Sequence, residues 1–405
     1  MGLIGGGFIM FSLRRYRKIL EEYNVFERCA KCGTCTYVYG SWAPACPAFN
    51  EFKFLTYSLG GKLLLAWGYL NGRLKLDQDI ARVFYSCTLC GNCAYQCQIT
   101  ETDGTRPIKL YAITLLEAMR KELVRVGLGP MPEQKRVWDW ILKEHNPYMA
   151  KHEDRSLWFP KDVVKGLPEK AEIVYFVGCT SAYIETEIID ATMRILNRLK
   201  VDYTILKDEW CCGLPLIRTG APSQLVDEVV NHNIAAIEDA GADMIVTSCP
   251  GCYRVWKEDL ADRHDFKVMH TVELVAEAIE RGELTFKKPL KAKVTYHDPC
   301  DLGRHCGVFE PPRKILKSIP GVELIEMERS RENSWCCGAG GAVAFWLPEF
   351  TMNTACERIR EAEETGASLL VSACPGCAMT LKNAIKEKGS RIMFRDITEL
   401  ILEHL

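Results

Sequence analysis

The sequence WCCG, at 210–213 and again at 335–338, decides the fold of this chain. In both copies a gap of 36 residues separates the adjacent cysteines from a CPGC motif, at 249–252 and 374–377. One further cysteine precedes each adjacent pair. The two five-cysteine sets are Cys179, Cys211, Cys212, Cys249 and Cys252, and Cys300, Cys336, Cys337, Cys374 and Cys377. A repeat of about 125 residues is too long for a solenoid unit, so it predicts a duplicated domain.

Each copy alternates β-branched runs with helical stretches. In the first copy the pattern predicts strands at 171–179, 202–207 and 244–248, and helices near 184–199, near 223–240 and after CPGC. The second copy predicts strands at 293–300, 322–328 and 368–374, with helices near 311–318, near 350–365 and from 376. Strands that alternate with helices indicate parallel α/β layers. The cysteines then lie at the carboxyl ends of strands, where such sheets build their sites.

Five thiolates in one site are too many for a tetrahedral zinc ion, which takes four ligands. A cluster of several irons accommodates adjacent cysteines, because neighbouring thiolates can bind different irons. Gly213 and Gly338 permit close backbone approach, and we expect Trp210 and Trp335 to cover the site. Zinc, buried structural cysteines and a catalytic dithiol in CPGC are the alternatives.

A second pattern occupies the N-terminal third. Its cysteines are Cys29, Cys32, Cys35 and Cys46, and Cys87, Cys90, Cys93 and Cys97. In two-cluster ferredoxins the fourth cysteine of a run binds the other cluster, which predicts Cys29, Cys32 and Cys35 with Cys97, and Cys87, Cys90 and Cys93 with Cys46. The long spacer before Cys46, and Gln98 where proline is usual, leave the fourth ligands open. A pair of zinc sites is the alternative.

Bulk properties limit the class of protein. The chain has 405 residues, 48% of them hydrophobic, a formal net charge of −2 and 20 cysteines. Near-neutral charge gives no reason to expect nucleic acid, and many cysteines in a long chain without a secretion signal indicate metal. No stretch approaches the roughly 20 apolar residues that span a bilayer. We expect a cytoplasmic protein, peripheral on the membrane face only through a partner.

The segments predict an α+β protein with a mainly helical two-cluster ferredoxin-like domain before two duplicated α/β domains. The expected divisions are an N-terminal helix or leader at 1–28, the ferredoxin-like domain at 29–130, a linker at 131–168, and the two repeats at 169–290 and 291–405. The insert 51–86 and the stretch 106–124 are expected to be helical. The linker is expected to hold one short helix and to dock the ferredoxin-like domain through packed tryptophans.

The doubled five-cysteine pattern resembles the CCG domain of the heterodisulfide reductase catalytic subunit, and also the iron–sulfur subunits of glycolate, lactate and glycerol-phosphate oxidases. Resemblance to the fused reductase subunit implies two cubane and two non-cubane [4Fe-4S] clusters, with a disulfide such as that of coenzymes M and B held between the non-cubane clusters and reduced to two thiols. It also implies a cytochrome b or flavoprotein partner. The alternative is an electron-transfer subunit that carries electrons from a flavin dehydrogenase towards quinone.

Other residues near the motifs are weaker candidates. His297, Asp298, Arg304 and His305 flank Cys300. His297 is a possible proton donor to a product thiolate, although a structural role is favoured. Arg218, Arg254 and Arg304 are candidates to hold an acidic substrate, and Cys306 and Cys356 look like spare thiols.

Overall fold

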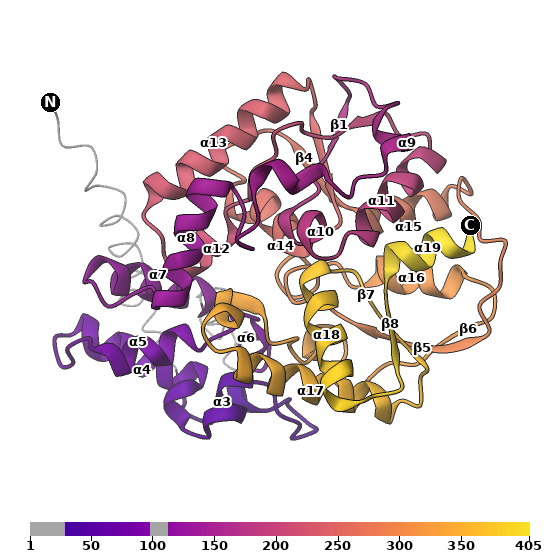
Figure 1. Ribbon diagram of the computed structural model, residues 1–405. Coiled ribbons are helices and arrows are strands. Elements are labelled where there is room, and N and C mark those ends of the chain that lie inside the picture. Colours follow the sequence, from indigo (N-terminus) through magenta and orange to yellow (C-terminus); the bar gives the residue numbers. More distant parts are fainter. Residues whose placement is uncertain (1–28, 98–111) are drawn as a thin grey trace, which may run out of the picture.

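The computed structural model describes residues 29–97 and 112–405. The helix or leader expected at 1–28, and the part of the 106–124 helix before residue 112, lie outside these ranges. Figure 1 shows three parts: a helical N-terminal module, and two α/β repeats beside it. The mixed helix and parallel-sheet architecture confirms the fold class.

The first repeat is built on a parallel sheet of β1 (Ile173–Tyr175), β2 (Tyr203–Thr204), β3 (Met244–Thr247) and β4 (Lys267–His270), in the order β2-β1-β3-β4. Its helices are α10 (Cys179–Tyr183), α11 (Glu187–Arg198), α12 (Leu214–Thr219), α13 (Ser223–Asp239), α14 (Pro250–Arg254) and α15 (Thr271–Glu280). The strands are shorter than predicted, and β4 was not predicted at all.

The second repeat has the same order. Its parallel sheet runs β6-β5-β7-β8, from β5 (Ala292–His297), β6 (Val322–Leu324), β7 (Leu369–Ser372) and β8 (Met393–Asp396). Its helices are α16 (Glu310–Ser318), α17 (Pro348–Glu364), α18 (Pro375–Lys388) and α19 (Ile397–His404). The matching strand orders confirm the duplication that the cysteine spacing predicts.

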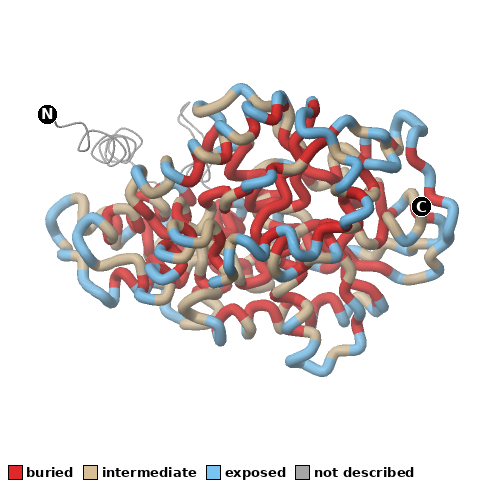
Figure 2. The backbone as a smooth tube through the Cα atoms, turned by 45° about the horizontal axis from the view of Figure 1, so that its top comes forward, coloured by how far each residue is buried: buried red, intermediate tan, exposed pale blue. Residues whose placement is uncertain are grey.

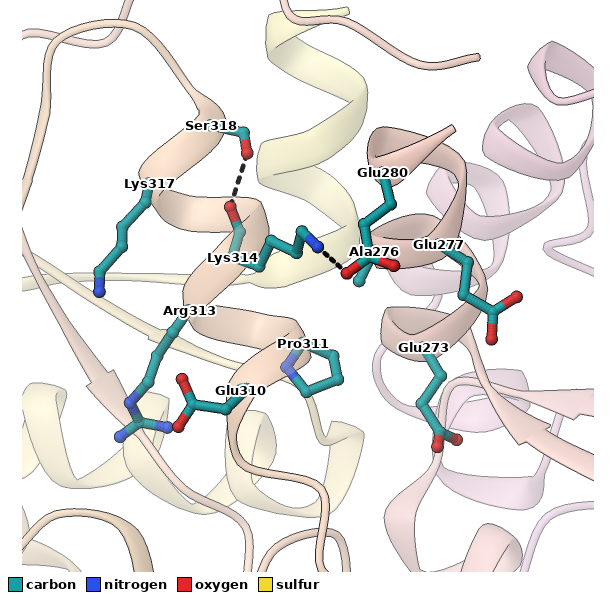
Figure 3. Close-up of a pocket in the computed structure, with 10 residues that line it drawn as sticks. All are labelled: Glu273, Ala276, Glu277, Glu280, Glu310, Pro311, Arg313, Lys314, Lys317 and Ser318. Carbon is teal, nitrogen blue, oxygen red and sulfur yellow. Dashed lines mark hydrogen bonds and ion pairs between the residues drawn. The ribbon is translucent and has the colours of Figure 1, made fainter. Parts of the chain in front are cut away.

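The last helix of each repeat packs on the other repeat. Helix α15 packs against α16, and α19 packs against α11. One apolar core therefore spans both repeats and joins Val272 and Val275 to Ile315 and Leu316. At the surface of this contact, Lys314 forms an ion pair with Glu280 beside a pocket of about 530 Å³ (Figure 3). These two helix contacts fix the orientation of one sheet relative to the other.

The N-terminal module is helical, as predicted for its insert. It contains α3 (Pro47–Phe52), α4 (Leu59–Leu70), α5 (Gln78–Tyr85), α6 (Asn92–Tyr95) and α7 (Ala112–Arg125). Ile80, Phe84 and Leu116 pack in its core with Leu59 and Leu63. No helix in the described ranges is long and apolar enough to cross a membrane.

The linker differs from its prediction. It holds two α-helices, α8 (Pro132–Glu144) and α9 (Lys161–Val164), instead of one short helix. Trp138 is buried, and its indole nitrogen donates to Thr219 Oγ1 at 2.7 Å, so this tryptophan docks the linker on the first repeat. Trp158 is 62% exposed, and the packing role expected for it is wrong.

Arg120, on α7, is the residue where all three parts meet. Its guanidinium is fully buried and donates to the carbonyls of Phe84 (2.9 Å) and Cys87 (2.5 Å) in the N-terminal module. The same group donates to Arg218 O and Gly341 O, both at 2.8 Å, in the first and second repeats. Figure 2 shows buried backbone running through the middle of the molecule, with exposed turns around it. The three parts thus share an interior.

Candidate functional site

The two five-cysteine sets lie at the topological switch points of the two sheets. In the first sheet, β1 and β3 are neighbours at the centre. The chain continues from β1 to β2 on one side and from β3 to β4 on the other side, so the loops after these two central strands diverge. Cys179 begins α10 after β1, and Cys249 precedes α14 after β3. Cys300 and Cys374 follow β5 and β7 in the same way. Open α/β sheets bind ligands at such points.

The thiols of the first set contact one another inside the fold. Cys212 accepts hydrogen bonds from Cys211 and Cys252, and these bonds lower the pKa of Cys212 well below its ordinary value. Cys211 also bonds to Cys179, and Cys252 bonds to Cys249. The result is a continuous chain of five thiols.

The second set repeats this arrangement. Hydrogen bonds from Cys336 and Cys377 lower the pKa of Cys337 well below its ordinary value. Cys336 also bonds to Cys300, and Cys377 bonds to Cys374. Soft thiolates in this number and proximity suit iron–sulfur clusters.

The glycine of each WCCG motif has the expected role. Gly213 and Gly338 have φ values of 87° and 94°, a left-handed conformation that favours glycine. Their backbone N–H groups donate to the sulfurs of Cys211 (3.4 Å) and Cys336 (3.3 Å). These bonds stabilise negative charge on sulfur.

One cavity of about 350 Å³ lies between the two sets. Its lining cysteines are Cys179, Cys211, Cys212, Cys249 and Cys252 from the first set and Cys300, Cys337, Cys374 and Cys377 from the second. Thr88 and Leu89 of the N-terminal module line it too, as do the apolar side chains of Leu214, Phe345 and Met379. The duplication therefore brings both sets to a single space.

Two of the three arginines expected to hold an acidic substrate, Arg218 and Arg254, are already paired with carboxylates. Arg218 and Arg254 line the cavity, but Arg218 forms ion pairs with Glu117 (2.9 Å) and Asp259. Arg254 pairs with Asp301 at 3.0 Å and with Glu117 at 3.4 Å. Two guanidiniums thus face three carboxylates, so this wall offers no excess positive charge. Arg304 lies outside the lining.

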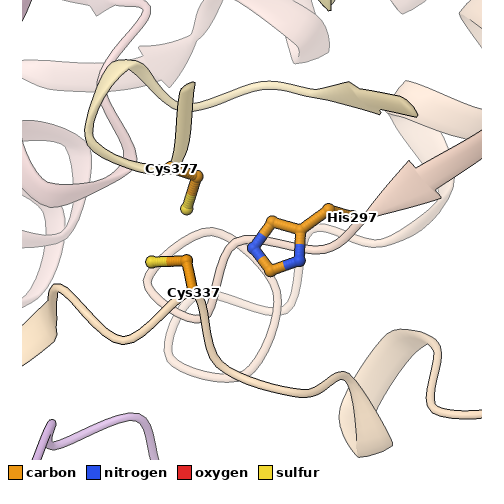
Figure 4. A group of neighbouring side chains, drawn as sticks. All are labelled: His297, Cys337 and Cys377. Carbon is orange, nitrogen blue, oxygen red and sulfur yellow. The ribbon is translucent and has the colours of Figure 1, made fainter. Parts of the chain in front are cut away.

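His297 faces the second cysteine set and does not line the cavity. Its Nδ1 accepts from Arg358 Nε at 3.0 Å, which leaves the ring proton on Nε2. Burial lowers the pKa of His297, and the ring bonds to Cys337. Figure 4 shows His297 beside Cys337 and Cys377, with one ligand atom from each within 4.8 Å of the others. His297 therefore acts on the cysteines of the second set from outside the cavity lining, and this position argues against His297 as a proton donor to a substrate in the cavity.

The N-terminal module contacts the second site directly. The thiols of Cys336 and Cys90 interact, and this interaction lowers the pKa of Cys90 to about 5. Tyr95 donates to Arg304 O at 3.1 Å, and His305 bonds to Leu89 O at 3.0 Å. His305 therefore belongs to the contact between the module and the second repeat.

The eight N-terminal cysteines fall into two groups. Cys29, Cys32, Cys35 and Cys97 line one cavity of about 340 Å³. Burial, with the nearby charges of Cys87 and Cys90, raises the pKa of Cys46 to about 12. Cys93 interacts with Cys46, Cys87 and Cys90, and more weakly with Cys35 of the first group. Cys97 thus lies with the first three cysteines and Cys46 near the second three, and the crossed ligand assignment stays a prediction.

Two residues near the first site were not foreseen. Arg155 Nη1 donates to Cys179 Sγ at 3.6 Å, and its guanidinium pairs with Glu209. Glu209 accepts the backbone N–H groups of Val177 and Gly178, both at 2.8 Å. Glu209 stands immediately before WCCG, but nothing in the sequence ties it to an arginine 54 residues earlier.

The remaining candidates lie outside the cavity lining. Cys306 packs against the core shared by the repeats, and Cys356 packs on α17 against the core of the second repeat. Asp298 is held by Arg313, at 2.7 and 2.9 Å. Trp210 packs with Cys179 and Cys211, stacked between His145 and His232. Trp335 is buried and donates to Thr354 O at 2.9 Å.

Comparison with known proteins agrees with this arrangement. The chain matches a 4Fe-4S dicluster domain over residues 25–100 and a cysteine-rich (CCG) domain over 173–256 and 294–382. It is 36% identical over 401 residues to a subunit of the dihydromethanophenazine:CoB–CoM heterodisulfide reductase of Methanosarcina acetivorans, covering 94% of each chain. It is 28% identical over 352 residues to the EtfAB:quinone oxidoreductase of Syntrophomonas wolfei, covering 81% of this chain and 47% of the relative.

A crystal structure of a hypothetical protein from Helicobacter pylori shares the fold, with a TM-score of 0.55 at 10% identity over 98% of this chain and 76% of that one. The relationship to the Methanosarcina protein, over nearly the full length of both chains, settles the family. The chain belongs to the family of iron–sulfur oxidoreductases that contains this heterodisulfide reductase subunit.

Proposed function

We propose that the chain reduces a disulfide, of the kind formed by coenzymes M and B, to two thiols in the cavity between the five-cysteine sets. The observation that carries this proposal is that a single cavity takes sulfur atoms from both sets. A disulfide has two sulfur atoms, and each faces one set when the molecule lies across the cavity.

The clusters would be held as the sequence predicts, two cubanes in the N-terminal module and one non-cubane cluster at each five-cysteine set. When bound, such clusters supply single electrons and irons that can bind sulfur. Reduction of one disulfide takes two electrons and two protons. The contact between Cys90 and Cys336 gives the N-terminal module a direct route to the second site.

The residues of the cavity would orient the disulfide and exclude water. Leu89, Phe345 and Met379 form an apolar wall that suits the aliphatic arms of a disulfide. Tyr148 also lines the cavity, and its hydroxyl lies 2.8 Å from Thr180 Oγ1. Because burial raises the pKa of Tyr148, this phenol stays protonated and can donate a hydrogen bond to a product thiolate.

The test is anaerobic oxidation of a reduced dye, started by the heterodisulfide. We expect Cys212→Ala and Cys337→Ala each to lose at least about 100-fold in rate, because each cysteine joins two others in its set. Cys356→Ala, outside the cavity, is the matched control and should keep the wild-type rate. Undiminished turnover in both site variants would refute the proposal.

The second candidate function is electron transfer within a flavin dehydrogenase complex, towards quinone. The similarity to the EtfAB:quinone oxidoreductase favours it. Copurification with a flavoprotein, and no disulfide-dependent dye oxidation, would support this function over the first. Either function places the chain in the cytoplasm beside a redox partner, a cytochrome b or a flavoprotein, at the membrane face.

A further inference from the structure

Arg304 lies between the N-terminal module and the second five-cysteine set. Its side chain is buried, at 6% exposure. Nε donates to Cys90 O at 2.7 Å, and Nη1 donates to Ser334 O at 2.6 Å and to Glu332 O at 3.2 Å. The guanidinium thus ties the loop of Cys90 to the segment that leads into Cys336.

This buried cation has no carboxylate partner. Within residues 29–97 and 112–405, no Asp or Glu forms an ion pair with Arg304, and its Nη2 has no hydrogen-bond partner. A buried charge without compensation is costly, and Arg stays charged at any accessible pH. The negative groups that act on Arg304 most strongly are the sulfurs of Cys90, Cys300 and Cys336. Asp298 acts on it more weakly, and this carboxylate is already held by Arg313. The positive charge is therefore available to the two neighbouring cysteine groups.

The first site is arranged differently. Its cation, Arg155, contacts Cys179 Sγ but is paired with Glu209, so the pair carries no net charge. The two sheets share one register, in which Tyr175 pairs with Val246 and Tyr296 with Val371. The residues that follow these tyrosines are Phe176 and His297, so the first site has a phenyl ring where the second has the N–H donor that bonds to Cys337.

We propose that Arg304, assisted by His297, stabilises the reduced state of the cluster at the second five-cysteine site, so that the two sites differ in reduction potential and the second is the higher. The physical reason is that reduction adds negative charge, which an unpaired cation and an N–H donor favour. This inference rests on the proposed function only in requiring clusters at both sites.

The test is a redox titration of the intact protein, followed by electron paramagnetic resonance in the absence of any disulfide. Cys212→Ala and Cys337→Ala assign the signals of the first and second site. In Arg304→Gln we expect the equilibrium constant for reducing the second site to fall at least about tenfold, which is about 59 mV for one electron. His297→Phe, which copies the first site, should lower it by a smaller factor.

The controls separate charge from geometry. Arg304→Lys keeps the charge, so its equilibrium constant for reducing the second site should stay within about threefold of wild type. Arg194→Gln, on the surface of α11, should change the reduction potential of neither site. The inference is overturned if Arg304→Gln keeps its iron and its equilibrium constant for reducing the second site changes by less than about threefold. It is equally overturned if the Lys variant falls as far as the Gln variant, or if both lose iron, because Arg304 would then only hold the loops.

The two proposals fail separately. A wild-type protein that reduces no disulfide loses the proposed function but keeps the difference in potential. Unmoved potentials in Arg304→Gln, together with active wild-type enzyme, would remove the inference alone.

Discussion

Replacement of Arg120 by methionine tests whether one side chain joins the N-terminal module to both repeats. The guanidinium donates to the carbonyls of Phe84, Cys87, Arg218 and Gly341, which belong to all three parts. Methionine fills a similar volume but donates nothing, so these buried carbonyls lose a charged donor.

The magnitude follows from these contacts. A hydrogen bond to a charged group contributes about 1.5–3 kcal/mol, but carbonyls that keep another partner lose less. Phe84 O, for example, also accepts from Cys87 N. We therefore expect a loss of about 3–5 kcal/mol, since an unsatisfied buried acceptor costs about 1–3 kcal/mol and several carbonyls lose their donor together. For a chain of 405 residues this is a fall of about 5 °C in Tm.

The assay is anaerobic thermal unfolding of the intact protein. Arg194→Met is the matched control, because Arg194 is partly exposed and pairs with Asp162 and Asp190 at the surface. Such surface pairs contribute about 0–1 kcal/mol, so its Tm should change by about 1 °C or less. Equal shifts in the two variants, or an Arg120→Met protein as stable as wild type, would refute the reasoning.

Two further substitutions test other parts of the fold. A Cβ on Gly340 would lie 2.4 Å from Thr88 O. We therefore expect Gly340→Ala to lower the free energy of unfolding by about 1–3 kcal/mol and to weaken the contact of the N-terminal module with the second site. In the control, Gly166→Ala, the nearest atom to the new Cβ is at 3.6 Å, so the stability should change little. Burial raises the pKa of Asp396 to about 7, so this carboxyl binds its proton more tightly in the folded chain than in the unfolded chain. The pKa of an Asp in the unfolded chain is about 4. The stability should therefore fall as the pH rises from about 4 to about 7. Asp396→Asn keeps a helix cap and should remove this loss in urea titrations across that range. An unchanged pH dependence in the variant would contradict the assignment.

Local features were predictable from the sequence. Six helices of the repeats (α11, α13, α14, α16, α17 and α18), and the cysteines that follow β1, β3, β5 and β7, were found because periodicity and motif spacing are properties of short segments. Helices α10, α12, α15 and α19 were not predicted. The edge strands β4 (KVMH) and β8 (MFRD) were missed because each has only four residues, half of them polar or charged, without a clear apolar alternation. Edge strands pair on one side only, so a weak apolar pattern suffices.

Long-range pairing was not predictable. Glu117, on α7, forms ion pairs with Arg218 and Arg254 of the first repeat across about 100 residues of chain or more, and no local signal links them. The sequence therefore predicts an anion-binding wall, whereas the structure shows a wall whose charges are already paired. The contact of Cys90 with Cys336 is of the same kind, because it depends on how the module docks.

Helices α15 and α19, each of which packs on the other repeat, explain how the two cysteine sets keep their separation without a substrate. If the repeats met only at the cavity, the sulfurs of the two sets would be held apart by whatever the cavity contained. Helices α15 and α19 instead place a shared apolar core away from the cavity, with Val272 and Ile315 fully buried in it. A packed core resists compression, so the distance between the sets is fixed by this core and by the ion pair of Lys382 with Glu185 across the repeats. If the chain reduces a disulfide in this cavity, as proposed, we expect its selectivity among disulfides to depend on their length more than on their charge, because the arginines of the wall are already paired.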